Sequence, residues 1–271
     1  MHIIFVGAGR LATQLAKALH SKGHTIEAVY SRTLASATAL ACQVDSIATD
    51  RLDALPLHAD AFILAVKDSV LPTLIPQLAE HREACPMFHT AGSMPLSVFG
   101  SLPHHGVIYP MQTFSKDRDV DFARIPVFIE ASDTLSLRVA ETIATSVSDH
   151  VQELSTSQRR YLHLAAVFAC NFTNHCYTLA ADILEQHGLS FDVMLPLIEE
   201  TTQKIKAMHP QDAQTGPAVR YDENVIQAQM QLLADTPALQ DVYHLMSQSI
   251  HRRSLPTPPA ANSTPLDSDP S

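Results

Sequence analysis

Four polar side chains recur at helical spacing inside the apolar segment 168–182. They fall at i, i+3, i+4 and i+7, which would place them on one helical face, and they are Asn171, Asn174, His175 and Thr178. Burying such groups unpaired costs roughly 1–3 kcal/mol each, so we expect them to face hydrogen-bonding partners. Amides can orient a substrate oxygen or nitrogen, and an imidazole titrates near working pH. Asn171, Asn174 and His175 are therefore candidate catalytic residues; the alternative is a buried amide–histidine network that joins this helix to the first domain or to a partner subunit.

A glycine motif follows the first apolar run of the chain. Gly7-x-Gly9-x-x-Ala12 stands at a predicted strand-to-helix junction, the position of a dinucleotide-binding fingerprint. Gly7 permits the turn, Gly9 lets a pyrophosphate approach the backbone, and Ala12 allows close packing of the helix on the strand. The alternative is a Rossmann domain that has lost its ligand. The residues expected to bind the cofactor here are Gly7, Ala8, Gly9, Arg10 and Leu11.

The end of the second predicted strand indicates which dinucleotide binds. NAD sites usually carry an acidic residue there, which holds the ribose 2′-hydroxyl. This chain has Ser31, Arg32 and Thr33 instead, and Glu27 comes too early, near the start of the strand. A guanidinium flanked by two hydroxyls suits a 2′-phosphate, which favours NADP over NAD. An ordinary helix N-cap followed by a surface arginine is the alternative.

Polar groups also follow the later predicted strands, in the segments AVKDS, HTAGS and YPMQTF. The carboxyl ends of the strands line the ligand crevice of a doubly wound sheet, so we expect these groups near the nicotinamide. A structural role fits His89 as well as a functional one. The candidates are Ala65, Val66, Lys67 and His89 for the cofactor, and Ser93, Gln112 and Thr113 for the substrate.

The order of apolar segments predicts the elements that position these groups. Strand-like and helix-like runs alternate over residues 1–153, which predicts an α/β Rossmann domain with a doubly wound, mostly parallel sheet. Strands are expected within 2–9, 25–31, 60–68, 86–91, 106–111 and 126–131, with helices within 10–23 and 34–43.

The second half of the chain is predicted to be helical. Residues 155–187 show no strand signal and no internal Gly or Pro, which predicts a helix of roughly 30 residues, ~45 Å long. Further helices follow, so 154–254 is expected to be an all-helical domain for substrate binding and dimerisation. The Pro/Ser-rich segment 255–271 is expected to be disordered.

A loop between these later helices is a second candidate substrate contact. Thr215 and Gly216 offer a hydroxyl and an amide, and Arg220 could clamp an anion. A plain helix-connecting turn is an equally good interpretation.

Composition and charge exclude several classes of function. The net charge of −10 argues against nucleic acid, and no apolar run approaches the ~20 residues of a membrane span. The N-terminus does not resemble a signal peptide, so a cytoplasmic protein is expected. The four cysteines show no C-x-x-C spacing, which predicts free thiols and no metal site.

These segments together resemble a family of bacterial proteins with an N-terminal Rossmann-like domain and a C-terminal domain of unknown function, number 2520. The family is similar to pyrroline-5-carboxylate reductases, deazaflavin-dependent NADP oxidoreductases and the 6-phosphogluconate dehydrogenase superfamily. The resemblance implies a 6-phosphogluconate-dehydrogenase-like helical domain that pairs with its copy in a homodimer. It rests on VGAGRLA, SRT, ILAVKD, HTAGS, YPMQTFS, NFTNHCY, PLIEETTQKI, QTGPAVRYD and VYHLMSQSI.

Two departures limit what the resemblance implies about chemistry. YPMQTF lies where pyrroline-5-carboxylate reductases carry a Met-Pro-Asn-Thr-Pro-type loop, but their Gly- and Thr-rich substrate loop is not matched. The Lys-x-x-x-Asn catalytic helix of 3-hydroxyacid and 6-phosphogluconate dehydrogenases is also missing.

The function expected from these observations is NADP-dependent hydride transfer to or from a small substrate in the interdomain cleft. The substrate would be a carbonyl/hydroxyl or an imine/amine. The main alternative is a non-catalytic NADP-binding regulatory or scaffolding protein. Reduction of a flavin or deazaflavin is less favoured, because that site would need aromatic walls and the chain has 6% aromatics and no Trp.

Overall fold

The computed structural model describes residues 1–116 and 118–255. The chain forms two compact units, the first from Met1 to Thr173 and the second from Asn174 onward. The segment predicted to be disordered lies outside the described residues, except for Leu255. Across the two described ranges, no helix combines the length and apolar character that crossing a bilayer requires.

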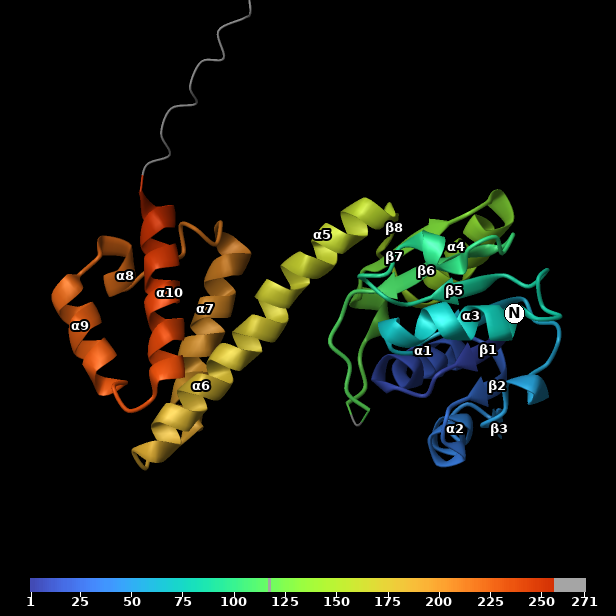
Figure 1. The fold of residues 1–271 in the computed structure, drawn as a ribbon, viewed down its shortest axis with the longest axis horizontal. Coiled ribbons are helices and arrows are strands. Elements are labelled where there is room, and N and C mark those ends of the chain that lie inside the picture. The colour runs from blue at the N-terminus through green and yellow to red at the C-terminus, as the bar shows by residue number, and fades with distance from the viewer. Residues whose placement is uncertain (117, 256–271) are drawn as a thin grey trace, which may run out of the picture. The chain divides into compact units, whose positions relative to one another are not determined.

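One sheet forms the centre of the first unit (Figure 1). Within the described residues it has eight strands in the order β3-β2-β1-β4-β5-β6-β7-β8, and neighbours are parallel except for β6 and β7. The predicted doubly wound, mostly parallel sheet is therefore confirmed. The strands are β1 His2–Val6, β2 Thr25–Tyr30, β3 Ile47–Thr49, β4 Ala61–Leu64, β5 Met87–His89, β6 His105–Pro110, β7 Val127–Ala131 and β8 Val151–Glu153.

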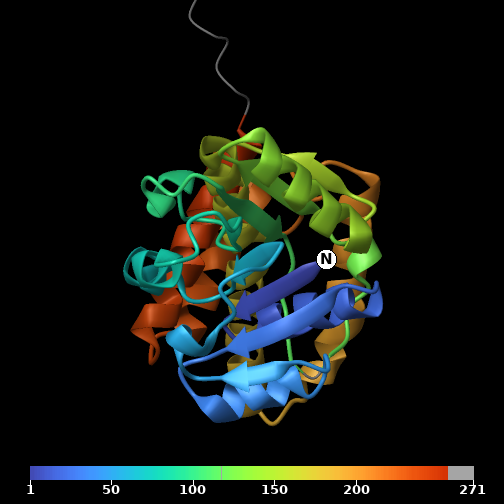
Figure 2. The same ribbon diagram turned by 90° about the vertical axis from the view of Figure 1, so that its right-hand side faces the viewer.

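Helices cover both faces of this sheet, whose first strands lie side by side in Figure 2. Two apolar clusters form the core: one joins the sheet to α1, α2 and α4, and the other joins it to α3. Leu15 and Ile3 belong to the first cluster, and Leu71 and Phe62 to the second. These helices are α1 Arg10–Ser21, α2 Leu34–Ala41, α3 Leu71–Ala79 and α4 Thr134–Val147.

A long helical segment links the first unit to the second along the chain. It comprises α5 Thr156–Ala166, a π-helical turn Val167–Phe172, and α6 Thr173–Gln186. A capping box fixes its start, because the Ser155 hydroxyl accepts from Gln158 N while the Gln158 side chain accepts from Ser155 N. The predicted helix over 155–187 is confirmed, and its π-helical interruption was not predicted.

The second unit contains α6 followed by further helices, of which α10, with 18 residues, is longer than α6. Asp222 caps α9, with its side chain accepting from Val225 N, and Pro237 occupies the first turn of α10. Within its described part, the buried residues are Ala218, Ile226 and Ser247. The remaining helices are α7 Leu195–Ala207, α8 Pro217–Arg220, α9 Glu223–Leu232 and α10 Pro237–Ser254, with short 3-10 turns elsewhere in the chain.

Candidate functional site

A cavity of about 610 Å³ opens in the first unit beside the glycine motif. It lies where the strand order reverses between β1 and β4, the position at which doubly wound sheets bind their ligands. Its walls come from the segments after β1, β2 and β4 and from α3. The lining residues are Gly7, Ala8, Gly9, Tyr30, Ser31, Arg32, Ser36, Leu52, Ala65, Val66, Lys67, Ser69, Val70, Thr73, Leu74 and Gln77.

The two glycines of the motif are required for different reasons. Gly7 has φ +119°, and a Cβ there would lie 2.2 Å from the carbonyl oxygen of Ala65, so a side chain would collide with the segment after β4. Gly9 caps α1, and a Cβ there would meet no protein atom within 4 Å. The fold therefore requires Gly7, whereas the space beside Gly9 is open to a ligand. This arrangement fits a pyrophosphate placed against Gly9 at the start of α1.

The charges around the cavity suit a polyanion. Arg32 and Lys67 line it and are exposed, and no Asp or Glu is among its described lining residues. The amino end of α1, a twelve-residue helix that begins at Arg10, adds its partial positive charge. The side chains present therefore fit a phosphorylated dinucleotide.

Most of the predicted cofactor residues line this cavity. Arg10 and Leu11 lie in the first turn of α1. Thr33 is the N-cap residue of α2, and its hydroxyl donates to Ser36 Oγ at 2.8 Å instead of accepting from a backbone N–H. The predicted residues in the lining are Gly7, Ala8, Gly9, Ser31, Arg32, Ala65, Val66 and Lys67.

Sequence reasoning missed the wall formed by α3 and the turn before it. Ser69, Thr73 and Gln77 recur every four residues and line one side of the cavity. Pro72 and Pro76 obscure this helical spacing, although Pro72 lies in the first helical turn, where a proline is tolerated.

His89 lies apart from the cavity, in the core. It is fully buried, stacks on Phe99 with ring centroids 5.5 Å apart, and its Nδ1 accepts a hydrogen bond from Ala91 N. Burial lowers the pKa of His89 to about 3, with the Arg159 charge acting in the same direction. The ring is neutral at physiological pH, and its surroundings favour the structural interpretation.

A tyrosine–histidine pair lies at the carboxyl end of β6. The Tyr109 hydroxyl and His163 Nδ1 of α5 share a hydrogen bond of 3.0 Å. Gly92 permits this contact, because a Cβ there would lie 2.5 Å from His163 Nδ1 and 2.9 Å from Tyr109 Cζ. Burial raises the pKa of Tyr109, and the Asp68 carboxylate raises it further, while Arg159 opposes them. No sequence pattern indicated this pair, which joins residues 54 positions apart.

Ser93, predicted to bind substrate, hydrogen-bonds a carboxylate next to the cavity. Its hydroxyl donates to Asp68 Oδ2. Asp68 lies between Lys67 and Ser69, both of which line the dinucleotide cavity. Ser93 therefore hydrogen-bonds a residue whose two chain neighbours line the cavity, which places Ser93 near the edge of the cavity.

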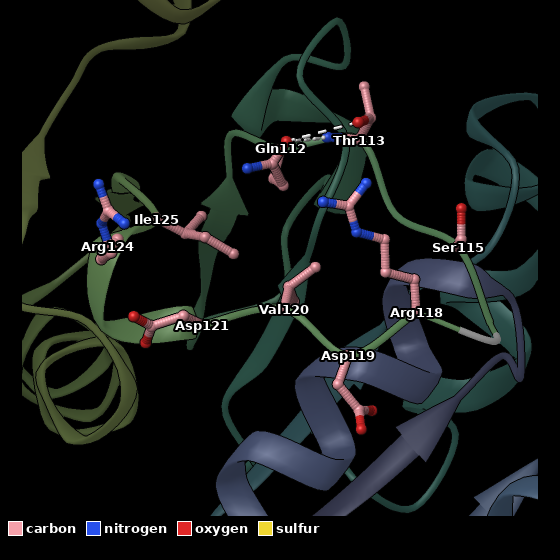
Figure 3. Close-up of a pocket in the computed structure, with 9 residues that line it drawn as sticks. All are labelled: Gln112, Thr113, Ser115, Arg118, Asp119, Val120, Asp121, Arg124 and Ile125. Atoms are coloured by element: carbon pink, nitrogen blue, oxygen red, sulfur yellow. Dashed lines mark hydrogen bonds between the residues drawn. The ribbon is translucent and has the colours of Figure 1, made fainter.

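Gln112 and Thr113 line a separate polar cavity of about 480 Å³ (Figure 3). Thr113 N donates to Gln112 Oε1 at 2.8 Å, and the Arg118 side chain is directed toward both residues. Lys17 of α1 pairs with Asp119 at 2.5 Å, which fastens this loop to the helix. These predicted substrate residues therefore lie in the loop between β6 and β7, outside the dinucleotide cavity.

The polar residues of the long helix fall on both sides of the boundary between the units. Asn171 lies in the π-helical turn, whereas Asn174 and His175 follow it in α6. A π turn shifts the helical register, so Asn171 is displaced from the single stripe that α-helical spacing predicts. All three side chains are exposed in the single chain. The buried network considered from sequence is therefore not formed within the described residues of one chain.

The predicted loop contacts lie in the second unit. Thr215 and Gly216 precede α8, where Gly216 has φ +105°, and Arg220 ends that helix. Thr215 and Arg220 are exposed. The structure describes them within their own unit, and their proposed contact with substrate stays a prediction.

Comparison with known proteins identifies the family. A model of a Rossmann-like domain matches residues 1–113, and a model of the domain of unknown function DUF2520 matches residues 125–250. A protein of Bacteroides fragilis, provisionally named an NADP oxidoreductase, is 52% identical, with 93% of this chain and 98% of that one covered and a TM-score of 0.89. The chain belongs to this Rossmann–DUF2520 family.

More distant structures share the fold of this family member. A protein from Thermotoga maritima is 22% identical, with 93% and 99% of the two chains covered and a TM-score of 0.78. An imine reductase from Myxococcus stipitatus, solved with NADP+, is 15% identical, with 93% of each chain covered and a TM-score of 0.67. A variant of that reductase was solved with NAD+. No functionally curated protein matches the chain.

Proposed function

We propose that this protein is an NADP-dependent oxidoreductase that acts on a small carbonyl/hydroxyl or imine/amine substrate. The observation that carries the proposal is the cavity at the strand-order switch, which has an open glycine, two cationic side chains and no carboxylate among its described lining residues. The Bacteroides fragilis relative, provisionally named an NADP oxidoreductase, supports the same assignment.

Each part of the cavity has a distinct role in this proposal. The backbone at Gly9 and the amino end of α1 would hold the pyrophosphate, and Arg32 with Ser31 would hold the 2′-phosphate. Val66 and Lys67 would lie along the bound dinucleotide. The cofactor would supply a hydride, and the protein's part is to orient the reactants and deliver a proton.

Arg32 also supports the choice of NADP over NAD. An acidic residue at the end of β2 would accept hydrogen bonds from a ribose 2′-hydroxyl and repel a phosphate. Here β2 ends at Tyr30 and leads into Ser31 and Arg32, both of which line the cavity. A planar guanidinium can donate two parallel hydrogen bonds to a phosphate.

Nucleotide titration of purified protein tests this assignment. NADPH and NADH binding would be followed by nucleotide fluorescence in the wild type, in Arg32→Ala, and in Arg138→Ala, a control on the exposed side of α4. We expect the wild type to bind NADPH more tightly than NADH. Arg32→Ala should lower this ratio of affinities at least tenfold, since one charge-assisted pair contributes about 1.5–3 kcal/mol, and Arg138→Ala should keep it. Absence of binding by either nucleotide would refute the proposal.

The polar residues of the long helix remain proposed for substrate handling. Asn171 and Asn174 would orient the substrate, with His175, the proton-exchange candidate indicated by the sequence, next to Asn174 in α6. In an oxidoreductase, Asn171→Ala/Asn174→Ala should lose turnover and keep NADPH affinity. A regulatory or scaffolding NADP-binding protein would show no turnover in the wild type.

The helical unit is proposed to pair with a second copy of the chain. Ala218 and Ile226 are the buried apolar side chains of its described part, whereas Leu197 and Leu245 are more than half exposed. A unit that buries so little apolar surface gains little stability by itself. A second copy would cover these side chains and supply the missing core.

A further inference from the structure

Three consecutive strands bring polar groups to one edge of the sheet. β4, β5 and β6 are parallel and in register, with Leu64 opposite His89 and His89 opposite Val107. Their carboxyl ends therefore lie together, and Asp68, Ser93 and Tyr109 stand at or just beyond them. This edge continues from the dinucleotide cavity, whose wall includes the residues on both sides of Asp68.

A hydrogen bond and an edge-on ring contact fix the position of the Tyr109 side chain. Its ring is 8% exposed, and its hydroxyl bonds His163 Nδ1 at 3.0 Å. The two rings meet edge-on with centroids 6.0 Å apart, above the bare backbone of Gly92. The glycine leaves room for this pair, and any side chain there would separate it.

A buried ion pair fixes the helix that carries His163. Arg159 lies one helical turn before His163 on the same face of α5 and is 1% exposed. Its guanidinium donates to Glu130 of β7 and to the Met94 carbonyl at 2.5 Å. The position of the imidazole is therefore set by the sheet.

We propose that Tyr109 is the proton donor of the reaction and that His163 positions and re-protonates it. This inference rests on the proposed oxidoreductase function. The groups that face Tyr109 are His163 and Arg159 from α5 and Asp68 from the segment after β4. Tyr109 suits the role better than His175, because the Tyr109 hydroxyl has a fixed partner and the His175 ring has none among the described residues.

Proton transfer from Tyr109 would accompany reduction of the substrate. A bound NADPH would supply a hydride to the carbon of a C=O or C=N bond and be left oxidised, and the π electrons would move to the oxygen or nitrogen. That atom takes the Tyr109 proton, which leaves a tyrosinate. His163 Nδ1 would return a proton to the tyrosinate while its Nε2 takes one from solvent, so the imidazole stays neutral and the net proton comes from water. The fixed positive charge of Arg159 stabilises the transient phenolate.

A tyrosinate titration of the full chain tests this placement without requiring turnover. Rapid pH jumps are followed by the ultraviolet absorbance of tyrosinate in the wild type and in Tyr109→Phe. The difference between the two proteins gives the pH midpoint at which the Tyr109 phenol ionises. We expect a midpoint above the ordinary value of about 10 in the free protein. It should be lower with NADP+ than with NADPH by about one unit or more, because the oxidised nicotinamide ring is cationic and a nearby cation favours the phenolate.

Variants of His163 test its positioning role. His163→Leu should raise the Tyr109 midpoint, because a phenolate can only accept a hydrogen bond and leucine donates none. His163→Gln keeps a donor and should stay closer to wild type. Equal midpoints in the two variants would show that His163 serves packing alone and would overturn its assigned role.

Turnover provides a second readout, with 2-methyl-1-pyrroline and cyclohexanone as probes of NADPH oxidation. Tyr109→Phe should lower kcat by about 10²–10⁴-fold and leave NADPH affinity unchanged. Tyr161→Phe, on the exposed surface of α5, should change neither. If both nucleotides bind but the Tyr109 midpoint is the same with each, this inference fails and the proposed function stands. If neither nucleotide binds, both fail.

Discussion

Arg159 and Glu130 form a buried ion pair that joins α5 to β7. The carboxylate also accepts from Thr156 N at 2.8 Å and from the Thr156 hydroxyl, so the start of the helix and its second turn share one anchor. Burial of the pair is unequal, with 1% of the Arg159 side chain exposed and 17% of that of Glu130. Because Arg159 is the more deeply buried partner, loss of Glu130 and loss of Arg159 should lower the free energy of unfolding by different amounts.

Removing Glu130 should destabilise the first unit more than removing Arg159. Glu130→Met would leave the Arg159 charge fully buried and uncompensated, at a cost of about 3–5 kcal/mol. Arg159→Met should cost less, about 1–3 kcal/mol, because the carboxylate keeps its Thr156 donors and some water. The double variant should recover much of the loss. Urea unfolding measures each value, and equal losses in the two single variants would contradict the argument.

The two glycines of the motif should separate folding from nucleotide binding. Gly7→Ala places a Cβ 2.2 Å from the Ala65 carbonyl oxygen at φ +119°, so we expect a loss of more than about 1 kcal/mol of stability. Gly9→Ala meets no protein atom within 4 Å and should keep its Tm. Its NADPH affinity should nevertheless fall at least about tenfold, equivalent to 1.4 kcal/mol. Unchanged NADPH affinity in Gly9→Ala would contradict the placement of the pyrophosphate against Gly9.

The buried His89 should make the stability of the protein depend on pH. Its pKa in the folded protein is lowered to about 3, whereas an unfolded histidine has a pKa of about 6.5. Between these values the unfolded chain binds a proton that the native protein does not, so stability falls as pH falls through this window. The slope should be on the order of 1 kcal/mol per pH unit.

Two variants isolate this effect of His89. His89→Phe keeps an aromatic ring against Phe99 and cannot titrate, so its unfolding free energy should depend less on pH below about 6.5. His58→Gln, at an exposed histidine, should retain the wild-type slope. If urea unfolding gave His89→Phe the same slope as the wild type, another group would be responsible.

Negative charges introduced at exposed apolar positions of the helical unit should dissociate the proposed dimer. Leu197→Glu in α7 and Leu245→Glu in α10 introduce carboxylates at exposed apolar positions, and burying a charge against a partner is strongly unfavourable. Sedimentation should show a dimer in the wild type and a monomer in these variants. Leu57→Glu, at an exposed leucine of the first unit, is the matched control and should remain dimeric. A monomeric wild type would refute the proposal.

Local patterns along the chain were sufficient to predict much of the architecture. Apolar runs and glycine positions indicated β1, α1 and β2, and the lack of strand signal and of internal Gly or Pro over 155–187 indicated the long helix. The glycine motif and Arg32 were placed at one cavity because parallel strands end at a common edge. These features depend on residues a few positions apart, for which side-chain periodicity is a direct physical signal.

Features that depend on distant contacts required the tertiary structure. The three-residue strands β3 and β8 exist because neighbouring strands pair with them, and neither lies in a continuous apolar run of the kind that indicated β5. The π-helical turn at Asn171 is a change in backbone hydrogen bonding that no side-chain spacing indicates. The sequence by itself determined six strands of the sheet and its glycine-lined edge. Only the tertiary structure brought Tyr109, Gly92 and His163 together, because contacts between distant segments depend on how the whole chain packs.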